Sequence, residues 1–132
     1  MHKEHFTIKQ ANDMIPWLEK TLKQALSIQQ RLSKLQDQML QLLRKSLGNG
    51  HKNHGRTVSE NQSTVEKYES ELERVLQDIT NKGVIVRDLN QGLVDFPAFQ
   101  DNHQVYLCWL VGEPKVNYWH ECDTGFQDRQ LL

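Results

Sequence analysis

The sequence has 132 residues, of which 37% are hydrophobic and 25% are charged, and its formal net charge is −1 at pH 7. This length and composition are typical of one globular domain, and the chain has too many apolar residues for a disordered protein. The near-neutral charge excludes a general attraction to nucleic acid or to an anionic membrane. We therefore expect a single domain over residues 1–132.

No segment resembles a secretory signal or a membrane span. The first six residues lack an apolar stretch, and the longest apolar run, 105–111, is far shorter than the ~20 residues that a membrane helix needs. Cys108 and Cys122 form neither a C-x-x-C pair nor a zinc-like spacing. We expect a cytoplasmic protein with reduced thiols that pack as small apolar side chains, and a metal or redox role is the alternative.

The first predicted element is a helix that begins at a capping box. Thr7 and Gln10 have the T-x-x-Q spacing in which each side chain caps a backbone amide of the other residue. Pro16 follows, and a proline inside a helix removes a backbone hydrogen bond and clashes with the preceding turn. We therefore expect a short helix near 8–14, then a break, with Pro16 in the first turn of a second, long helix.

Two heptad patterns flank a segment rich in glycine and predict an antiparallel helical hairpin. The first runs over 17–47 and the second over 58–82, and the predicted loop is 48–57. Gly83 is expected to cap the second helix in the left-handed conformation. The apolar positions are Leu18, Leu22, Ala25, Ile28, Leu32, Leu35, Met39 and Leu42 in the first helix, and Val58, Val65, Tyr68, Leu72, Val75 and Ile79 in the second.

Charge supports this pairing of the helices. Residues 1–57 carry ten Lys and Arg against four acids, a net +6, whereas residues 58–132 carry six against thirteen, a net −7. A basic helix beside an acidic helix is the complementary arrangement of a coiled coil. Because the first helix is longer, the residues before about 24 lack a helical partner and are expected to pack against the C-terminal third.

The sequence of the C-terminal third predicts short strands joined by turns. Apolar or β-branched runs cover 84–86, 92–96 and 105–111, and a fourth covers 116–119. The second run is expected to end at Pro97, and the turns fall at 101–103 and 112–114. The whole chain is therefore expected to be α+β: a long two-helix coiled-coil hairpin over 7–82 and a small antiparallel β-sheet cap over 83–132.

A wide apolar face on the hairpin favours a homodimer, with a monomer as the alternative. A seam between two helices buries one narrow stripe of each, and several leucines fall outside that stripe. The leucines outside the stripe are Leu26, Leu43, Leu47 and Leu76.

A set of short motifs lies along the chain at 6–7, 11–12, 92–97, 105–109, 112–114, 119–121, 125–126 and 129–130. In these motifs the chain resembles a small bacterial family known as domain of unknown function 2203, and the resemblance implies a cytoplasmic helical protein with no assigned activity. It covers essentially the whole chain, and the C-terminal motifs are its most specific part. Leu131 departs from it, since the family usually has a proline there.

Acidic residues and a histidine within apolar sequence form the first candidate site. A buried carboxylate needs a partner, and a divalent metal held by Asp95, Glu113 and His120 would supply one. Ion pairs with Arg87 or Arg129 are the alternative, and a catalytic acid/base site is another. The full set of candidates is Asp88, Asp95, Glu113, His120, Glu121 and Asp123.

The basic tip of the hairpin is the second candidate, for the phosphates of nucleic acid. Its loop has no aromatic residue to stack on bases, so nucleic acid is not the favoured partner. The tip residues are Arg44, Lys45, His51, Lys52, His54 and Arg56.

The third candidate is the helical surface itself, as a docking surface for protein. The sequence therefore predicts a non-enzymatic module for protein interaction or self-association. The alternative is a metal-binding or hydrolytic protein with its site in the cap.

Overall fold

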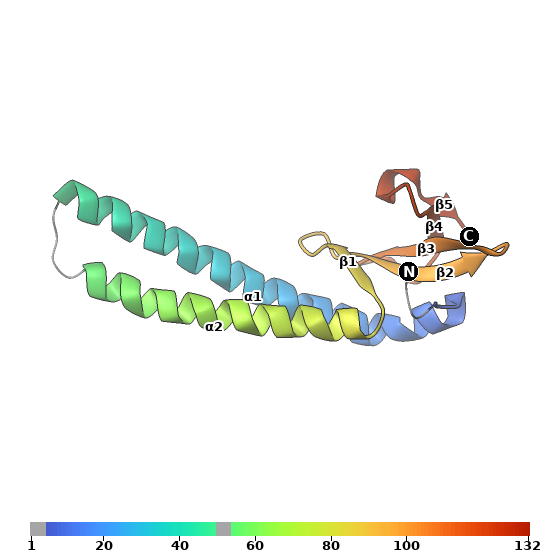
Figure 1. Ribbon diagram of the computed structural model, residues 1–132, viewed down its shortest axis with the longest axis horizontal. Coiled ribbons are helices and arrows are strands. Elements are labelled where there is room, and N and C mark those ends of the chain that lie inside the picture. The colour runs from blue at the N-terminus through green and yellow to red at the C-terminus, as the bar shows by residue number, and fades with distance from the viewer. Residues whose placement is uncertain (1–4, 50–53) are drawn as a thin grey trace. The chain divides into compact units, whose positions relative to one another are not determined.

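The computed structural model of the protein describes residues 5–49 and 54–132, with side chains for 5–45 and 60–132. Two helices come first, α1 (Ile8–Asn49) and α2 (His54–Asn81), and they pack against each other (Figure 1). A five-stranded antiparallel sheet follows. This α+β arrangement confirms the predicted fold class.

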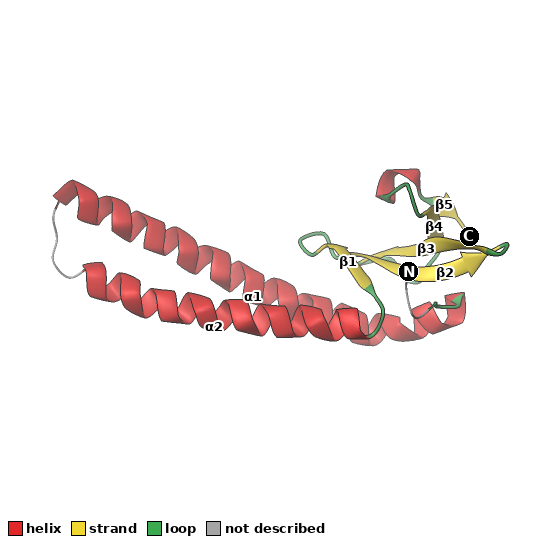
Figure 2. Cartoon of the chain, viewed as in Figure 1, coloured by secondary structure: helices red, strands yellow, loops and turns green. Residues whose placement is uncertain are grey.

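The strands form a meander in which every neighbour in sequence is a neighbour in the sheet (Figure 2). All four pairings are antiparallel. The sequence patterns predicted the first four strands but not the fifth, nor the single 3-10 turn η1 (Phe126–Asp128) before it. The strands are β1 (Ile85–Asp88), β2 (Leu93–Gln100), β3 (His103–Leu110), β4 (Tyr118–Glu121) and β5 (Gln130–Leu131).

The chain divides into two compact units. The first contains the residues up to Lys23 together with Leu76–Leu132, and the second is Gln24–Val75. The sheet therefore shares a unit with the first turns of α1 and the last turn of α2, and the described residues of the second unit, 24–49 and 54–75, are all helical. Within the described residues, neither helix has a stretch with the length and hydrophobicity that a bilayer crossing requires.

The start of α1 confirms the capping box and corrects the predicted break. The amide of Thr7 donates to Oε1 of Gln10 at 2.9 Å, and the amide of Gln10 donates to Oγ1 of Thr7 at 3.1 Å. The helix then continues through Pro16 without interruption, so the expectation of a separate short helix is wrong. Ala11 and Leu18, one on each side of the proline, are both fully buried in the same core. This packing of one continuous helix face offsets the hydrogen bond that Pro16 lacks.

The predicted loop 48–57 is too long at both ends. The helix α1 extends to Asn49 and α2 already begins at His54, so only 50–53 separate the helices, and these four lie outside the described residues. At the other end of α2 the prediction is confirmed, because Gly83 has a φ of +90° and its amide donates to the carbonyl of Thr80 at 2.9 Å.

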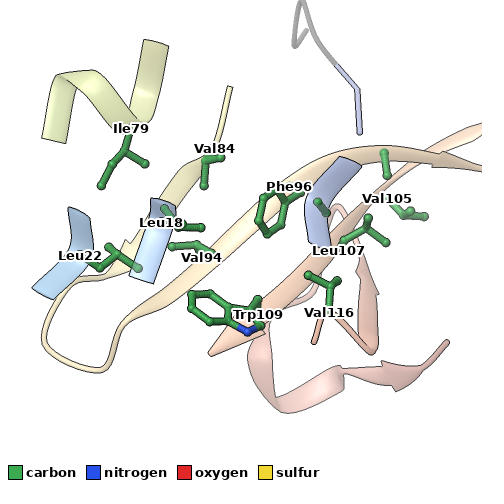
Figure 3. Close-up of a cluster of buried hydrophobic side chains, with 12 residues drawn as sticks. Leu18, Leu22, Ile79, Val84, Val94, Phe96, Val105, Leu107, Trp109 and Val116 are labelled. Carbon is green, nitrogen blue, oxygen red and sulfur yellow. The ribbon is translucent and has the colours of Figure 1, made fainter. Parts of the chain in front are cut away.

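One face of the sheet forms the core of the first unit together with the helix ends. Leu18 and Leu22 of α1 and Ile79 of α2 are at most 2% exposed, and Figure 3 shows them beside Phe96 and Trp109 of the sheet. The side chains of Ile15 and Trp17 are partly buried against the same cluster. The expected packing of the start of α1 against the C-terminal third is therefore confirmed.

The strand β2 passes through Pro97 rather than ending there, which corrects the prediction. The carbonyl of Pro97 accepts a hydrogen bond from the amide of Phe6 at 2.7 Å, so the backbone polar groups of Pro97 point away from β3. The pairing of β1 with β2 reaches only Leu93–Asp95, and the missing N–H of Pro97 therefore faces the edge of β2 that β1 does not cover. No ladder hydrogen bond with β3 is lost.

A two-residue turn sets the register of the central hairpin. Gln100 pairs with His103, and the residues between them, Asp101 and Asn102, have φ values of 51° and 66°. Both values lie in the left-handed region, as a type I′ turn requires. Asp and Asn tolerate this conformation better than other residues with side chains do, so the sequence favours this turn type.

Replacing Gly92 with alanine is expected to destabilise the protein by about 2–4 kcal/mol. Gly92 has a φ of +72°, and an added Cβ would lie 2.4 Å from Cγ2 of Val111. Gly112→Ala is the matched control, since Gly112 has a φ of +105° but open space around it. It should cost only the backbone strain, about 1–2 kcal/mol. Urea unfolding followed by circular dichroism measures both losses, and equal losses would refute the clash.

Candidate functional site

The strands bring three chemically different side chains together on the second face of the sheet. In β2, Asp95 alternates with the residues that point into the core, so its side chain lies on the opposite face. Cys108 of β3 is the direct cross-strand partner of Asp95. His120 of β4 pairs with Tyr106, two residues from Cys108, and therefore lies on the same face.

These three side chains are buried and close. Asp95 is 1% exposed, Cys108 is 1% exposed and His120 is 2% exposed. A carboxylate oxygen of Asp95, Sγ of Cys108 and a ring nitrogen of His120 all lie within 4.8 Å of one another. Nε2 of His120 lies 3.0 Å from each carboxylate oxygen of Asp95. We call this group the Asp–Cys–His cluster.

Arg87 of β1 completes the surroundings of the carboxylate. Its Nε donates to Oδ2 of Asp95 at 2.8 Å, and its guanidinium lies 5.0 Å from the ring centre of Tyr106. Burial lowers the pKa of Arg87, but the hydrogen bonds and charges of Asp95 and Tyr106 together outweigh it, so the pKa is raised. A permanent cation therefore stabilises the buried carboxylate, as the ion-pair alternative expects.

The second ring nitrogen of His120 is held by the backbone. Nδ1 lies 2.8 Å from the carbonyl oxygen of Glu121. A carbonyl oxygen only accepts, so Nδ1 carries a proton and donates it. This contact fixes the orientation of the ring and leaves Nε2 as the nitrogen that faces Asp95.

Cys108 is not a reactive thiol in this setting. Burial, and then the charge of Asp95, raise the pKa of its thiol to about 12. A thiol attacks as its thiolate, so a buried, protonated Cys108 is a poor nucleophile. The Asp–Cys–His cluster therefore contains the residue types of a nucleophilic triad, but its thiol is not activated for attack.

Glu113 takes part in a different contact. Its Oε2 accepts from Nη2 of Arg129 at 2.6 Å, and its Oε1 accepts from the amide of Leu110 at 2.7 Å. The guanidinium carbon of Arg129 also lies 3.9 Å from the ring centre of Tyr118. The carboxylate of Glu113 therefore holds the turn after β3 and the C-terminal segment. Of the three residues in the predicted metal site, the structure brings Asp95 and His120 together but not Glu113.

The other acidic candidates lie at turns or on the surface. Oδ1 of Asp88 accepts from the amide of Gln91 at 3.2 Å within a turn. The carboxylate of Glu121 lies 3.2 Å from Nε2 of His103 at an exposed position, and Asp123 is exposed. These three carboxylates therefore need no metal ion as a partner.

The basic tip of the hairpin is only partly described. Arg44 and Lys45 are exposed. His51 and Lys52 lie outside the described residues, and the side chains of His54 and Arg56 are likewise not described. Nucleic-acid binding at the tip stays a prediction.

An open cavity of about 740 Å³ lies elsewhere in the first unit, at the ends of the two helices. No member of the Asp–Cys–His cluster lines it, so it gives no access to the cluster. The lining residues are His5, Phe6, Gln10, Asp13, Met14, Asn81 and Lys82.

Fold and site together define an α+β protein in which a helical hairpin precedes an antiparallel meander with a closed polar cluster on one face. The chain belongs to the family described as Uncharacterized conserved protein (DUF2203), whose model matches residues 4–132. This match confirms the resemblance seen in the sequence. No curated protein and no solved structure matches the chain.

Proposed function

We propose that this protein is a non-enzymatic self-association module in which the helical unit, Gln24–Val75, binds the same unit of a second copy. The observation that carries the proposal is the exposure of two leucines on α1. Leu40 is 48% exposed and Leu43 is 45% exposed. Two such side chains three residues apart form one apolar surface on a helix whose other exposed residues between 24 and 45 are polar or charged.

The apolar stripe of α1 becomes less buried along the helical unit, which supports an uncovered apolar face. Near the start of the helical unit, Ala25, Ile28 and Leu32 are at most 9% exposed. Farther along the same stripe, Met39 and Leu42 are only half-buried. One helix covers one narrow stripe, so α2 leaves the stripe of Leu40 and Leu43 open. A second hairpin placed there would make a four-helix bundle, which buries a broad face of each helix.

Charge favours a second copy over an unrelated partner. Between 20 and 45 the first helix carries six basic residues and one acid, whereas between 60 and 78 the second carries six acids and two bases. In a bundle of two hairpins, each basic helix lies beside the acidic helix of the other copy. Such charges select the partner and the register more than they add affinity.

The test is the mass of the full chain in solution, measured by sedimentation equilibrium. The wild-type protein should have the mass of a dimer, and Leu40→Glu with Leu43→Glu should give a monomer. Each change places a charge in a contact that is expected to be apolar, and an unpaired buried charge is strongly unfavourable.

A matched control distinguishes the effect of where the charges are placed from the effect of adding charge. Gln38 and Gln41 are exposed, and at 100° per residue they lie on the other side of α1 from Leu40 and Leu43. Gln38→Glu with Gln41→Glu adds the same charge and should stay dimeric. A monomeric wild-type protein, or equal dissociation of both double variants, would overturn the proposal.

A further inference from the structure

We propose that the Asp–Cys–His cluster is a binding site for one transition-metal ion of the zinc class, with Asp95, Cys108 and His120 as its protein ligands. This site is independent of self-association and lies in the other unit of the chain. It differs from the site expected from the sequence, because Cys108 takes the place of Glu113.

The first argument is the convergence of donor atoms. A carboxylate oxygen, a thiol sulfur and an imidazole nitrogen from three adjacent strands lie within 4.8 Å of one another. Ligands on a zinc ion lie about 2.0–2.3 Å from the metal, so neighbouring donor atoms are separated by roughly 3–4 Å. The spacing in the cluster is close to this range. The strands are rigid elements, so the donors are already positioned.

The second argument is the proton count at His120. Nδ1 donates to the carbonyl of Glu121, so a neutral ring has no proton left for Nε2. The lone pair of Nε2 would then face two carboxylate oxygens of Asp95 at 3.0 Å, and both sides would be acceptors. Either a proton shared by the two groups or a bound cation has to lie between them. Nδ1 on a backbone carbonyl with Nε2 toward the metal is the usual arrangement of a metal-ligating histidine.

The third argument is the type of donor. Mixed nitrogen, sulfur and oxygen ligands suit zinc and related borderline ions, whereas magnesium and calcium prefer oxygen alone. Cys108 is the softest of the three donors and gives up its proton when it binds the ion. Asp95 can bind through Oδ1, because Oδ2 is the oxygen that Arg87 holds.

The burial of the cluster argues for ion binding without hydrolysis. All three ligands are at most 2% exposed, so a substrate does not reach the ion in this structure. An ion there would link β2, β3 and β4 across the second face of the sheet. Its expected effect is therefore on stability.

Cobalt(II) is the probe, added to the full chain after a strong chelator has been removed by dialysis. A thiolate ligand gives an intense sulfur-to-cobalt charge-transfer band in the near ultraviolet, which histidine and carboxylate ligands do not give. The band should saturate at one equivalent of cobalt, and zinc should displace it. The melting temperature should rise with zinc until the site is filled.

Two cysteine variants identify the ligand. The chain has only Cys108 and Cys122, and Cys122 is exposed. Cys108→Ser should abolish the charge-transfer band and lower the zinc affinity more than about 100-fold, since loss of an outer-shell partner alone costs 10–100-fold. Cys122→Ser should change neither. No band in the wild-type protein, or a band lost only with Cys122→Ser, would refute the site.

Arg87→Gln gives a second measurement that does not depend on the folding of the Cys108 variant. The guanidinium of Arg87 holds Oδ2 of Asp95 and so orients the carboxylate, and its side chain is 43% exposed. Its removal should weaken zinc binding about 10–100-fold, as the loss of an outer-shell partner does, if the ion uses the carboxylate. Unchanged or tighter binding in this variant would mean that Asp95 is not a ligand.

Discussion

Replacing Trp109 with alanine is expected to lower the free energy of unfolding of the sheet-containing unit by about 3–5 kcal/mol. Trp109 is 0% exposed, and it lies in the core with Leu18 of α1 and Phe96 of β2 (Figure 3). Removing the indole leaves a large cavity and unpairs the carbonyl of Glu113, to which Nε1 donates at 3.0 Å. Domains have a total stability of about 5–15 kcal/mol, so the loss takes a large share of it. Urea unfolding followed by far-ultraviolet circular dichroism measures it.

Two other variants separate the cavity from the hydrogen bond at Trp109. Trp109→Phe keeps most of the apolar volume but cannot donate, and its loss should be about 1–2 kcal/mol. Phe99→Ala removes an aromatic side chain that is 61% exposed, and its loss should be below about 1 kcal/mol. If Phe99→Ala were as destabilising as Trp109→Ala, the core would not be centred on β3.

Replacing Asp95 with alanine should destabilise the protein by about 3–5 kcal/mol when a chelator is present. The carboxylate accepts a hydrogen bond from Nε of Arg87 at 2.8 Å, and Nε2 of His120 lies 3.0 Å from it. Its loss leaves a buried imidazole without its partner, and such a polar group is costly inside a protein. Urea unfolding of chelator-treated protein isolates this effect from any bound metal.

The control and a mutant cycle test the cause of the loss at Asp95. Asp123 is exposed, so Asp123→Ala should change the stability by no more than about 0.5 kcal/mol. Adding His120→Leu to Asp95→Ala removes the unpaired imidazole, and the double variant should be about 1–3 kcal/mol more stable than the sum of the single losses predicts. Strict additivity would show that the two side chains do not act as a pair.

Local patterns predicted most elements of the fold. The capping box of Thr7 and Gln10, the left-handed Gly83 and the order of the first four strands are all confirmed. The errors lie where packing outweighs a local rule. A proline ends a helix only when nothing compensates for the lost hydrogen bond, and around Pro16 the buried face of α1 does so.

The candidate site was only partly predictable from the sequence, although the turn between β2 and β3 indicates one more of its members. The turn at 101–102 sets the register of β2 and β3, and this register places Cys108 directly opposite Asp95. A reading of the turn type would therefore have added Cys108 to the candidates. Glu113 could not be assigned in this way, because its partner, Arg129, lies in the C-terminal segment that no pattern positioned.

The sequence by itself determined the two helices, the turns and the strand alternation that separates Asp95 from the core, since these depend on residues two to four positions apart. Only the tertiary structure decided that Asp95, Cys108 and His120 meet, and that Glu113 pairs with Arg129 instead. Asp95 and His120 are 25 residues apart, and their contact depends on the register of two strand pairings at once. A shift of one residue in either pairing would turn a member of the cluster to the other face of the sheet.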